Sequence, residues 1–164
     1  MGAGYSPPMQ KIVMSWSESG GETKSTLAVH LAAGLAIRGK SVALIDLDPQ
    51  GTATLHCGFP EESIGDCVGS AGLIKGRKTQ TLLEYEPKSR GMGKPFWLAP
   101  STPALYALAA GRGYSNHSKF REALEDLEVD FVVIDAGPGF SNLTIAGLVV
   151  ADEILVPVRA RSSK

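Results

Sequence analysis

A glycine-rich segment near the start of the chain carries residue types suited to binding phosphate. Residues 17–26 have the sequence Ser-Glu-Ser-Gly-Gly-Glu-Thr-Lys-Ser-Thr and lie between an apolar run and a helical pattern. Backbone N–H groups in such a loop, with the positive end of the following helix, attract an anion, and glycines allow its close approach. We therefore predict a phosphate-binding loop made of Ser19, Gly20, Gly21, Glu22, Thr23, Lys24, Ser25 and Thr26.

Three side chains of this loop have defined roles in phosphate chemistry. Lys24 would neutralise the β- and γ-phosphates of a nucleotide, the Ser25 hydroxyl would bind Mg²⁺, and Thr26 would lie near the α-phosphate. The standard phosphate-loop pattern requires glycine at the positions that Glu18 and Thr23 occupy. The segment alone is therefore equally compatible with a glycine-rich turn that merely joins a strand to a helix.

Three aspartates stand where apolar runs end. Asp46 and Asp48 follow the run 42–45, and Asp135 follows the run 131–134. Carboxylates at the carboxyl ends of strands beside a phosphate loop are placed to hold a divalent cation or to orient water. The alternative for Asp46 and Asp48 is a polar turn that ends a strand, since Asp is common before Pro.

Hydrophobic periodicity indicates which elements position these residues. Continuous apolar runs are typical of parallel strands covered on both faces, and apolar residues at every third or fourth position indicate helices. We predict strands at 11–16, 42–45, 96–99, 131–134 and 154–158, and helices at 24–38, 103–110, 119–127 and around Leu143, Leu148 and Val149. Residues 58–94 have weak periodicity, so loops and short helices are expected there. Strands that alternate with helices predict an α/β three-layer sandwich on a mostly parallel sheet.

Length and composition favour one domain without a strong charge. The 164 residues are 43% hydrophobic with a net charge of -1, which favours a single domain at 10–164 after a flexible segment at 1–9. Cys57 and Cys67 lack metal-ligand spacing and are expected to be reduced thiols. The absence of a signal peptide and of an apolar run of about 18 residues predicts a cytoplasmic protein with no membrane partner. Because the sequence stops directly after a strand, we expect a C-terminally truncated domain.

The segment after the second predicted strand resembles one family of ATPases. Residues 46–54 read Asp-Leu-Asp-Pro-Gln-Gly-Thr-Ala-Thr. The ParA/MinD family has a variant phosphate loop, Lys-Gly-Gly-x-Gly-Lys-Thr, then a strand ending in Asp-x-Asp-Pro-Gln, then a strand ending in an aspartate before a proline-rich turn. Residues 17–26, 46–50 and 131–139 are similar to these elements in the same order, and 141–158 is also similar to the family. The resemblance implies a P-loop NTPase fold of the SIMIBI class.

The resemblance implies a role for each matching residue. Lys24 and Ser25 would hold phosphate and Mg²⁺. Asp48 corresponds to the family aspartate that orients or activates the attacking water, Asp46 to its partner near the metal, and Asp135 to the carboxylate that supports the metal through water. The implied catalytic residues are thus Asp48 and Lys24, the implied metal site is Ser25, Asp46 and Asp135, and the implied cofactors are ATP or ADP and Mg²⁺. Positioning and charge stabilisation by so few groups suit slow hydrolysis.

Several positions depart from the family pattern. The signature lysine, which reaches across a dimer to the partner's nucleotide, aligns with Ser19, as in the McdA group that spaces carboxysomes. Thr23 puts a side chain where glycine is usual, with a strain of about 1 to 2 kcal/mol if the backbone is left-handed. Glu22 adds a negative charge beside an anion site. Ala136 and Gly137 stand where the family has Thr-Pro.

The resemblance implies an ATP-dependent switch in plasmid or chromosome partition or in cargo positioning. Its partners would be a second copy of the chain, bound in the ATP state, a ParB-like adaptor that stimulates hydrolysis, and nonspecific DNA, which would place the protein at the nucleoid. Arg159 and Arg161 could supply the missing cross-dimer charge. One alternative is a non-hydrolysing regulatory or scaffold protein of the same fold, favoured by Ser19, Glu22 and Thr23. Another is a MinD-like membrane-associated ATPase, which needs a C-terminal amphipathic helix that this sequence lacks.

Two further groups of residues are expected to be structural. Trp16 and Trp97 lie in predicted strands, where packing in the core is the expected role. Arg112, Lys119 and Arg121 form a modest basic cluster, which is more often a solvated helix face than a surface for DNA.

Overall fold

The computed structural model describes residues 10–19, 23–86, 94–111 and 116–158. These residues form a six-stranded sheet in the order β3-β4-β2-β5-β1-β6. Its strands are β1 (Lys11–Ser15), β2 (Val42–Asp46), β3 (Leu83–Tyr85), β4 (Phe96–Ala99), β5 (Phe131–Asp135) and β6 (Glu153–Leu155). The pair β3 and β4 is antiparallel, and the other neighbouring pairs are parallel. The predicted α/β fold on a mostly parallel sheet is confirmed.

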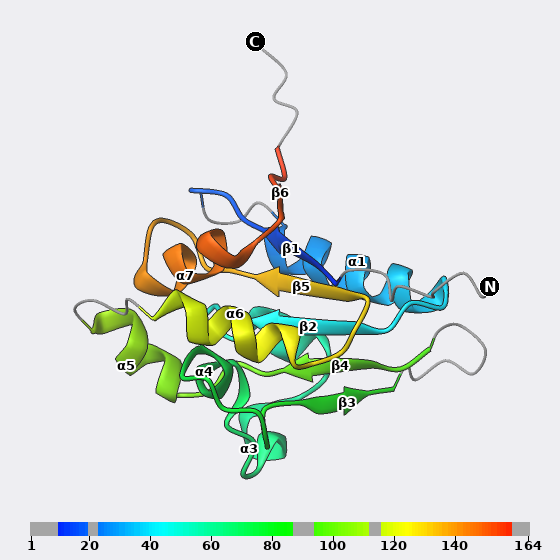
Figure 1. Ribbon diagram of the computed structural model, residues 1–164, viewed down its shortest axis with the longest axis horizontal. Helices are drawn as coiled ribbons and strands as arrows, with labels where there is room; N and C mark the ends of the chain where they lie inside the picture. The colour runs from blue at the N-terminus through cyan, green and yellow to red at the C-terminus, as the bar shows by residue number, and fades with distance from the viewer. Residues whose placement is uncertain (1–9, 20–22, 87–93, 112–115, 159–164) are drawn as a thin grey trace, which may run out of the picture.

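Helices cover both faces of this sheet (Figure 1). Side chains alternate along each central strand, so that Leu44 and Val133 pack with α1, whereas Ile45 and Ile134 pack on the opposite face. One face is covered by α1 (Lys24–Ile37) and α2 (Thr52–His56), and the other by α4 (Gly69–Ile74), α5 (Ala104–Ala110), α6 (His117–Glu125) and α7 (Asn142–Val150), while α3 (Glu61–Ile64) follows α2. The sandwich therefore has the three layers that the periodicity predicts.

The helix that follows the phosphate-loop segment is held close to the sheet by small residues. Ala28, Ala32 and Ala36 are fully buried, one turn apart, and the neighbouring leucines Leu27, Leu31 and Leu35 are half-buried. Small side chains on the buried stripe let the helix axis approach the strands. α1 ends before Gly39, whose φ of 84° turns the chain so that the Lys40 N–H group bonds back to the Leu35 carbonyl at 3.1 Å. The predicted helix is therefore right to within one residue.

Other boundaries differ more from the sequence pattern. The strand β3 lies inside the segment 58–94, where only loops and short helices were expected. It has three residues at the sheet edge with no buried apolar run, so period alone does not reveal it. The helix predicted at 119–127 begins earlier, at His117, because Asn116 caps it by accepting a hydrogen bond from the Lys119 N–H group. The last strand is 153–155 rather than 154–158.

The tryptophan predictions have different outcomes. Trp16 is half-buried against the core, as expected. Trp97 is 41% exposed, so its assignment to the core was wrong. It lies on the opposite side of β4 from the buried Phe96 and Leu98, paired with Glu84 of the edge strand β3.

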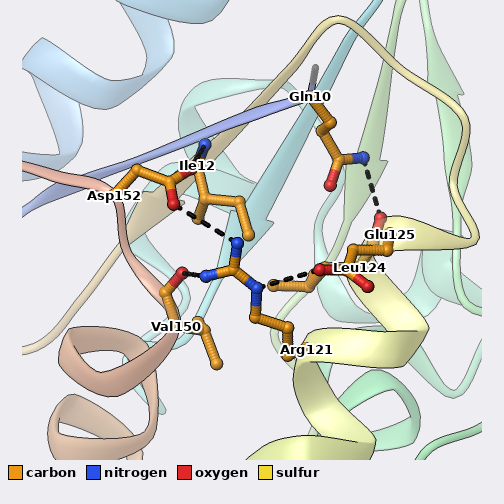
Figure 2. A network of polar contacts seen from close by, with 7 residues as sticks. All are labelled: Gln10, Ile12, Arg121, Leu124, Glu125, Val150 and Asp152. Carbon is orange, nitrogen blue, oxygen red and sulfur yellow. Dashed lines mark hydrogen bonds and ion pairs between the residues drawn. The ribbon is translucent and has the colours of Figure 1, made fainter.

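The basic cluster is also not a uniform solvated face. Arg121 on α6 donates to the Val150 carbonyl at 3.0 Å, and pairs with Glu125 at 2.9 Å and Asp152 at 3.3 Å (Figure 2). The Asp152 carboxylate in turn accepts from the Ile12 N–H group at 2.8 Å. Because Val150 ends α7, its carbonyl lacks a helical partner and Arg121 supplies one. Arg121 therefore fastens α6 to α7 and β1, which corrects the expectation.

The remaining expectations concern exposed side chains, thiols and membrane spans. Lys119 is exposed as predicted, whereas Arg112 and the flexible segment expected at 1–9 lie outside the described residues. Cys57 and Cys67 are free thiols, and burial raises the pKa of Cys57 to about 12. Among the residues the structure describes, no helix has the length and apolar character needed to cross a membrane.

Candidate functional site

The carboxyl ends of three neighbouring strands bring the predicted site residues to one edge of the sheet. In the parallel register, Asp135 of β5 is paired with Ser15 of β1 on one side and with Asp46 of β2 on the other. The phosphate-loop segment follows β1, and Asp48 follows β2 by two residues. Segments separated by more than 100 positions in the sequence are therefore adjacent here, where ligands bind in open α/β sheets.

Lys24 lies folded against its own loop. Its side chain is buried, and Nζ donates to the Ser19 carbonyl at 2.8 Å and to the Ser17 hydroxyl at 3.4 Å. The Ser15 hydroxyl donates to the Lys24 carbonyl at 3.1 Å, which fastens the first turn of α1 to the end of β1. The positive charge is therefore held at the loop, where, among the described residues, an anion would compete with one neutral carbonyl and one hydroxyl.

The backbone before Lys24 has the conformation that makes a side chain unfavourable. Thr23 has φ 57° and ψ 20°, in the left-handed region, so the predicted strain of about 1 to 2 kcal/mol applies. Ser19 and Thr26 are exposed, and the Thr26 carbonyl bonds to Nδ1 of His30 at 2.8 Å. The predicted loop residues Gly20, Gly21 and Glu22 lie outside the described residues, as do Arg159 and Arg161.

Asp135 is a buried carboxylate whose two oxygens lack a hydrogen-bond partner among the described residues. It is 0% exposed, and neither Oδ1 nor Oδ2 is hydrogen-bonded within the part of the chain that the structure describes. Burial, followed by the negative charge of Asp46, raises its pKa to about 7. The nearby Ser25 hydroxyl and the Lys24 ammonium oppose this rise, although Ser25 does not reach hydrogen-bond geometry with either oxygen. An unsatisfied group of this kind points to a missing partner.

Magnesium fits the donor set at this edge. Mg²⁺ prefers oxygen ligands, keeps several waters, and is usually bound through one or two carboxylates or hydroxyls together with substrate phosphates. Asp135 and Ser25 provide such oxygens beside the Lys24 charge. In the described ranges, no group of three or more His, Cys, Asp or Glu side chains could hold a metal alone. The residues present therefore suit an ion that arrives with a phosphate ligand.

Asp46 is equally buried, but both of its carboxylate oxygens accept hydrogen bonds from protein donors. Oδ2 accepts from the Thr54 N–H group at 2.8 Å and from the Thr54 hydroxyl at 2.6 Å, and Oδ1 accepts from the Asp48 N–H group at 3.1 Å. Burial raises the pKa of Asp46 to about 6, and these hydrogen bonds lower it. Asp46 thus lies next to Asp135, as expected, but three of its four lone pairs are used within the chain.

Asp48 stands on a tight turn that faces the segment after β5. Its Oδ1 accepts from the Gln50 N–H group at 2.9 Å, and its carbonyl accepts from the Gly51 N–H group at 2.9 Å. A β-carbon placed on Gly137 would lie 3.2 Å from both Cγ and Oδ1 of Asp48. The glycine that departs from the family pattern therefore provides room for this carboxylate.

A contact that the sequence did not indicate joins the loops after β1 and β5. The Gly139 N–H group donates to the Glu18 carbonyl at 3.2 Å, and Nε1 of Trp16 donates to the Gly139 carbonyl at 3.2 Å. The rings of Trp16 and Phe140 lie 4.9 Å apart. These contacts connect the predicted phosphate-loop segment to the segment after Asp135. They could not be predicted from local sequence, because the partners are more than 120 positions apart.

A cavity of about 190 Å³ borders the Asp48 turn on the side of α2, α3 and α5. Gly51, Thr54 and Ser101 line it, with Leu55 and Tyr106 exposed nearby. Its lining includes neither Lys24 nor Asp135, so it is separate from the predicted phosphate site.

Comparison with known proteins gives a consistent picture. The family described as "AAA domain" matches residues 9–163. The chromosome-partitioning ATPase Soj of Thermus thermophilus is 38% identical over 147 residues, covering 88% of this chain and 53% of Soj. The chain is thus similar in sequence to a partition ATPase and spans about half the length of the relatives it matches.

Solved structures show the same fold with nucleotide present. Cobyrinic acid a,c-diamide synthase from Mycobacterium smegmatis, with bound ADP and magnesium, superposes with a TM-score of 0.77 and 26% identity, covering 92% of this chain and 60% of that one. An McdA variant from Cyanothece in complex with ATP has a TM-score of 0.74 and 25% identity, with coverage of 92% and 57%. The fold described above therefore also occurs in proteins that hold adenine nucleotides.

Proposed function

This chain belongs to the AAA-domain family of ParA/MinD-type P-loop ATPases, and from that premise we propose that it binds ATP with Mg²⁺ and hydrolyses it slowly, as a switch. The observation that carries the proposal is Asp135, a buried carboxylate with no partner in the described chain, beside Lys24 and Ser25. A buried anion without a partner is unfavourable. A bound cation and its phosphate ligand would remove that cost.

Each of the three residues has a distinct task in this proposal. Lys24 exchanges its weak neutral acceptors for phosphate oxygens, which form stronger, charge-assisted hydrogen bonds. The Ser25 hydroxyl and the Asp135 carboxylate provide the oxygens nearest to the ion. When bound, Mg²⁺ would supply positive charge that neutralises the phosphate oxygens during transfer.

Hydrolysis is assigned to Asp48. Its carboxylate lies on a turn adjoining the segment after β5, and among the described residues Oδ1 accepts from the Gln50 N–H group while Oδ2 has no hydrogen bond. The other oxygen is available to orient an attacking water. Because phosphoryl transfer needs mainly positioning and charge stabilisation, one such carboxylate is sufficient for slow turnover.

The cellular role that we propose is partition of DNA or positioning of cargo. Support comes from the sequence similarity to the partition ATPase Soj and from the fold shared with McdA. In this role two copies associate when ATP is bound, the dimer binds nonspecific DNA, and a ParB-like adaptor stimulates hydrolysis. Ser19, in the position of the family's cross-dimer lysine, makes an McdA-like positioning role an alternative beside partition.

Nucleotide binding is tested with a fluorescent ATP analogue titrated in Mg²⁺ and in EDTA. Lys24→Ala removes the only charged donor that the described loop provides, so affinity should fall by about 10- to 100-fold. Lys40→Ala is the matched control, because Lys40 is exposed and precedes β2 at the opposite edge of the sheet. Absence of binding by the unaltered chain, or equal losses in the two variants, contradicts the proposal. Binding without turnover supports the non-hydrolysing scaffold instead.

A further inference from the structure

We propose that Thr54 is a positioning residue for Asp48, acting through Asp46, and that it controls turnover rather than nucleotide affinity. The inference rests on the proposed function, since Asp48 is taken to orient the attacking water. It also reassigns Asp46, which the family resemblance places near the metal, to a structural task within the turn.

The Thr54 hydroxyl is enclosed and both of its hydrogen-bonding functions are used. Thr54 is 3% exposed. Its Oγ1 donates to Oδ2 of Asp46 at 2.6 Å and accepts from the Ser101 N–H group at 2.9 Å. The direction of each bond is unambiguous, because a backbone N–H can only donate and a carboxylate accepts. Thr54 thus joins the end of β2 to the segment after β4.

The Asp46 carboxylate holds both ends of the segment that contains Asp48. Oδ1 accepts from the Asp48 N–H group at 3.1 Å, while Oδ2 accepts from Thr54 N–H and hydroxyl groups. Between these two anchors, the Gly51 N–H group closes the turn on the Asp48 carbonyl. One carboxylate therefore sets where the turn begins and where α2 starts, and the position of Asp48 depends on both.

The neighbouring strand fixes the same turn from the other side. The hydroxyl of Ser70 on α4 donates to the Asp46 carbonyl at 2.6 Å, and the Pro100 carbonyl, which follows β4, lies 3.2 Å from the same hydroxyl oxygen. A β-carbon on Gly51 would lie 3.5 Å from Cβ of Ser101, so the turn already packs against the residue that donates to Thr54. The turn is thus anchored to β4 as well as to β2.

This arrangement predicts a specific kinetic consequence. None of these hydrogen bonds involves Lys24, Ser25 or Asp135, the residues proposed to hold phosphate and Mg²⁺. Loss of the Thr54 hydroxyl should therefore leave nucleotide binding in place and displace Asp48. Small displacements of a positioning group reduce turnover strongly, since a shift of about 1 Å can lower a rate by about 100-fold.

The test compares Thr54→Val, which keeps the shape without the hydroxyl, with Thr54→Ser, which keeps the hydroxyl. We expect kcat to fall by about 10-fold or more in the valine variant with ATP affinity within about 3-fold, and Thr54→Ser to remain within about 3-fold in both. Thr52→Val is the control, because Thr52 starts the same helix and is half-buried. It should behave as the unaltered chain.

A measurement without nucleotide separates this inference from the proposed function. Hydrogen exchange at the Ser101 and Asp48 amides should accelerate in Thr54→Val and not in Thr54→Ser. The inference is overturned if the valine variant keeps its turnover, if serine fails to rescue it, if affinity and turnover fall together, or if amide exchange is unchanged. If the unaltered chain neither binds nor hydrolyses ATP, the proposed function fails, and the exchange data alone decide the role of Thr54.

Discussion

Asp46 and Asp135 end adjacent parallel strands and face each other in register, yet their surroundings are opposite. Both are 0% exposed. Asp46 accepts three hydrogen bonds from the turn and helix after β2, whereas Asp135 accepts none among the described residues. Two identical side chains at the same level of one sheet therefore have different environments, and the segment after each strand sets the difference.

The difference separates a structural aspartate from one that is available to a ligand. After β2 the chain turns back through Gly51 into α2, and the start of this short helix supplies donors to Asp46. After β5 the chain continues through Ala136 and Gly137 and supplies none to Asp135. A buried carboxylate that folding leaves unsatisfied is destabilising on its own. Its presence is explained if a cation, bound with phosphate, is its partner.

Neutralising each aspartate separately should give the largest difference between the two sites. Asp135→Asn should weaken Mg²⁺-dependent nucleotide binding by about 10- to 100-fold, because a group that supports the ion is lost. Without ligand at pH 8, the same change should raise the free energy of unfolding by about 1 to 3 kcal/mol, since a desolvated charge is removed. Asp46→Asn should lower it by about 1 to 3 kcal/mol, because its amide cannot satisfy three donors.

Urea unfolding in EDTA and titration with the ATP analogue measure both properties in the same preparations. Opposite signs for the two stability changes support the assignment. If both variants are destabilised to the same extent, Asp135 has a structural partner and the proposed ion site is wrong.

The pH dependence of the free energy of unfolding tests whether Asp135 has a raised pKa. Burial raises the pKa of Asp135 from 3.8 to about 7, so between about pH 4 and pH 7 the folded chain binds more protons than the unfolded chain. The free energy of unfolding attributable to Asp135 therefore falls as pH rises through this window and is constant above it. The advantage of Asp135→Asn over the unaltered chain should be absent near pH 4 and reach its full value near pH 8. A difference that does not vary with pH contradicts the raised pKa.

The smallest expected effect comes from the contact between the two regions. Gly137→Ala places a β-carbon 3.2 Å from Asp48, which must move by a few tenths of an ångström. We expect kcat to fall by about 3- to 10-fold with nucleotide affinity unchanged. Steady-state ATPase assays test this, and Gly34→Ala is the control because a β-carbon there meets nothing within 4 Å. If Gly137→Ala and Gly34→Ala have the same turnover, the packing of Gly137 against Asp48 does not affect hydrolysis.

Much of the fold could be predicted from local patterns. The apolar runs that became β2 and β5 are buried on both faces, and such runs are typical of a parallel sheet covered by helices on both sides. The alanine stripe and Gly39 likewise predict α1 and its end. The edge strand β3 and the exposure of Trp97 could not be predicted, because both depend on where the sheet stops.

The candidate site, like the fold, could be predicted from the sequence only in part. Local sequence identified the candidates for phosphate and metal chemistry, since Lys24, Ser25 and the strand-end aspartates are recognised by residue type and by their position in each element. The hydrogen bonds from Thr54 to Asp46, and the lack of any to Asp135 from the described residues, follow from the tertiary fold. Hydrogen-bond satisfaction depends on which donors the fold brings within about 3 Å, and residues far apart in the chain provide them.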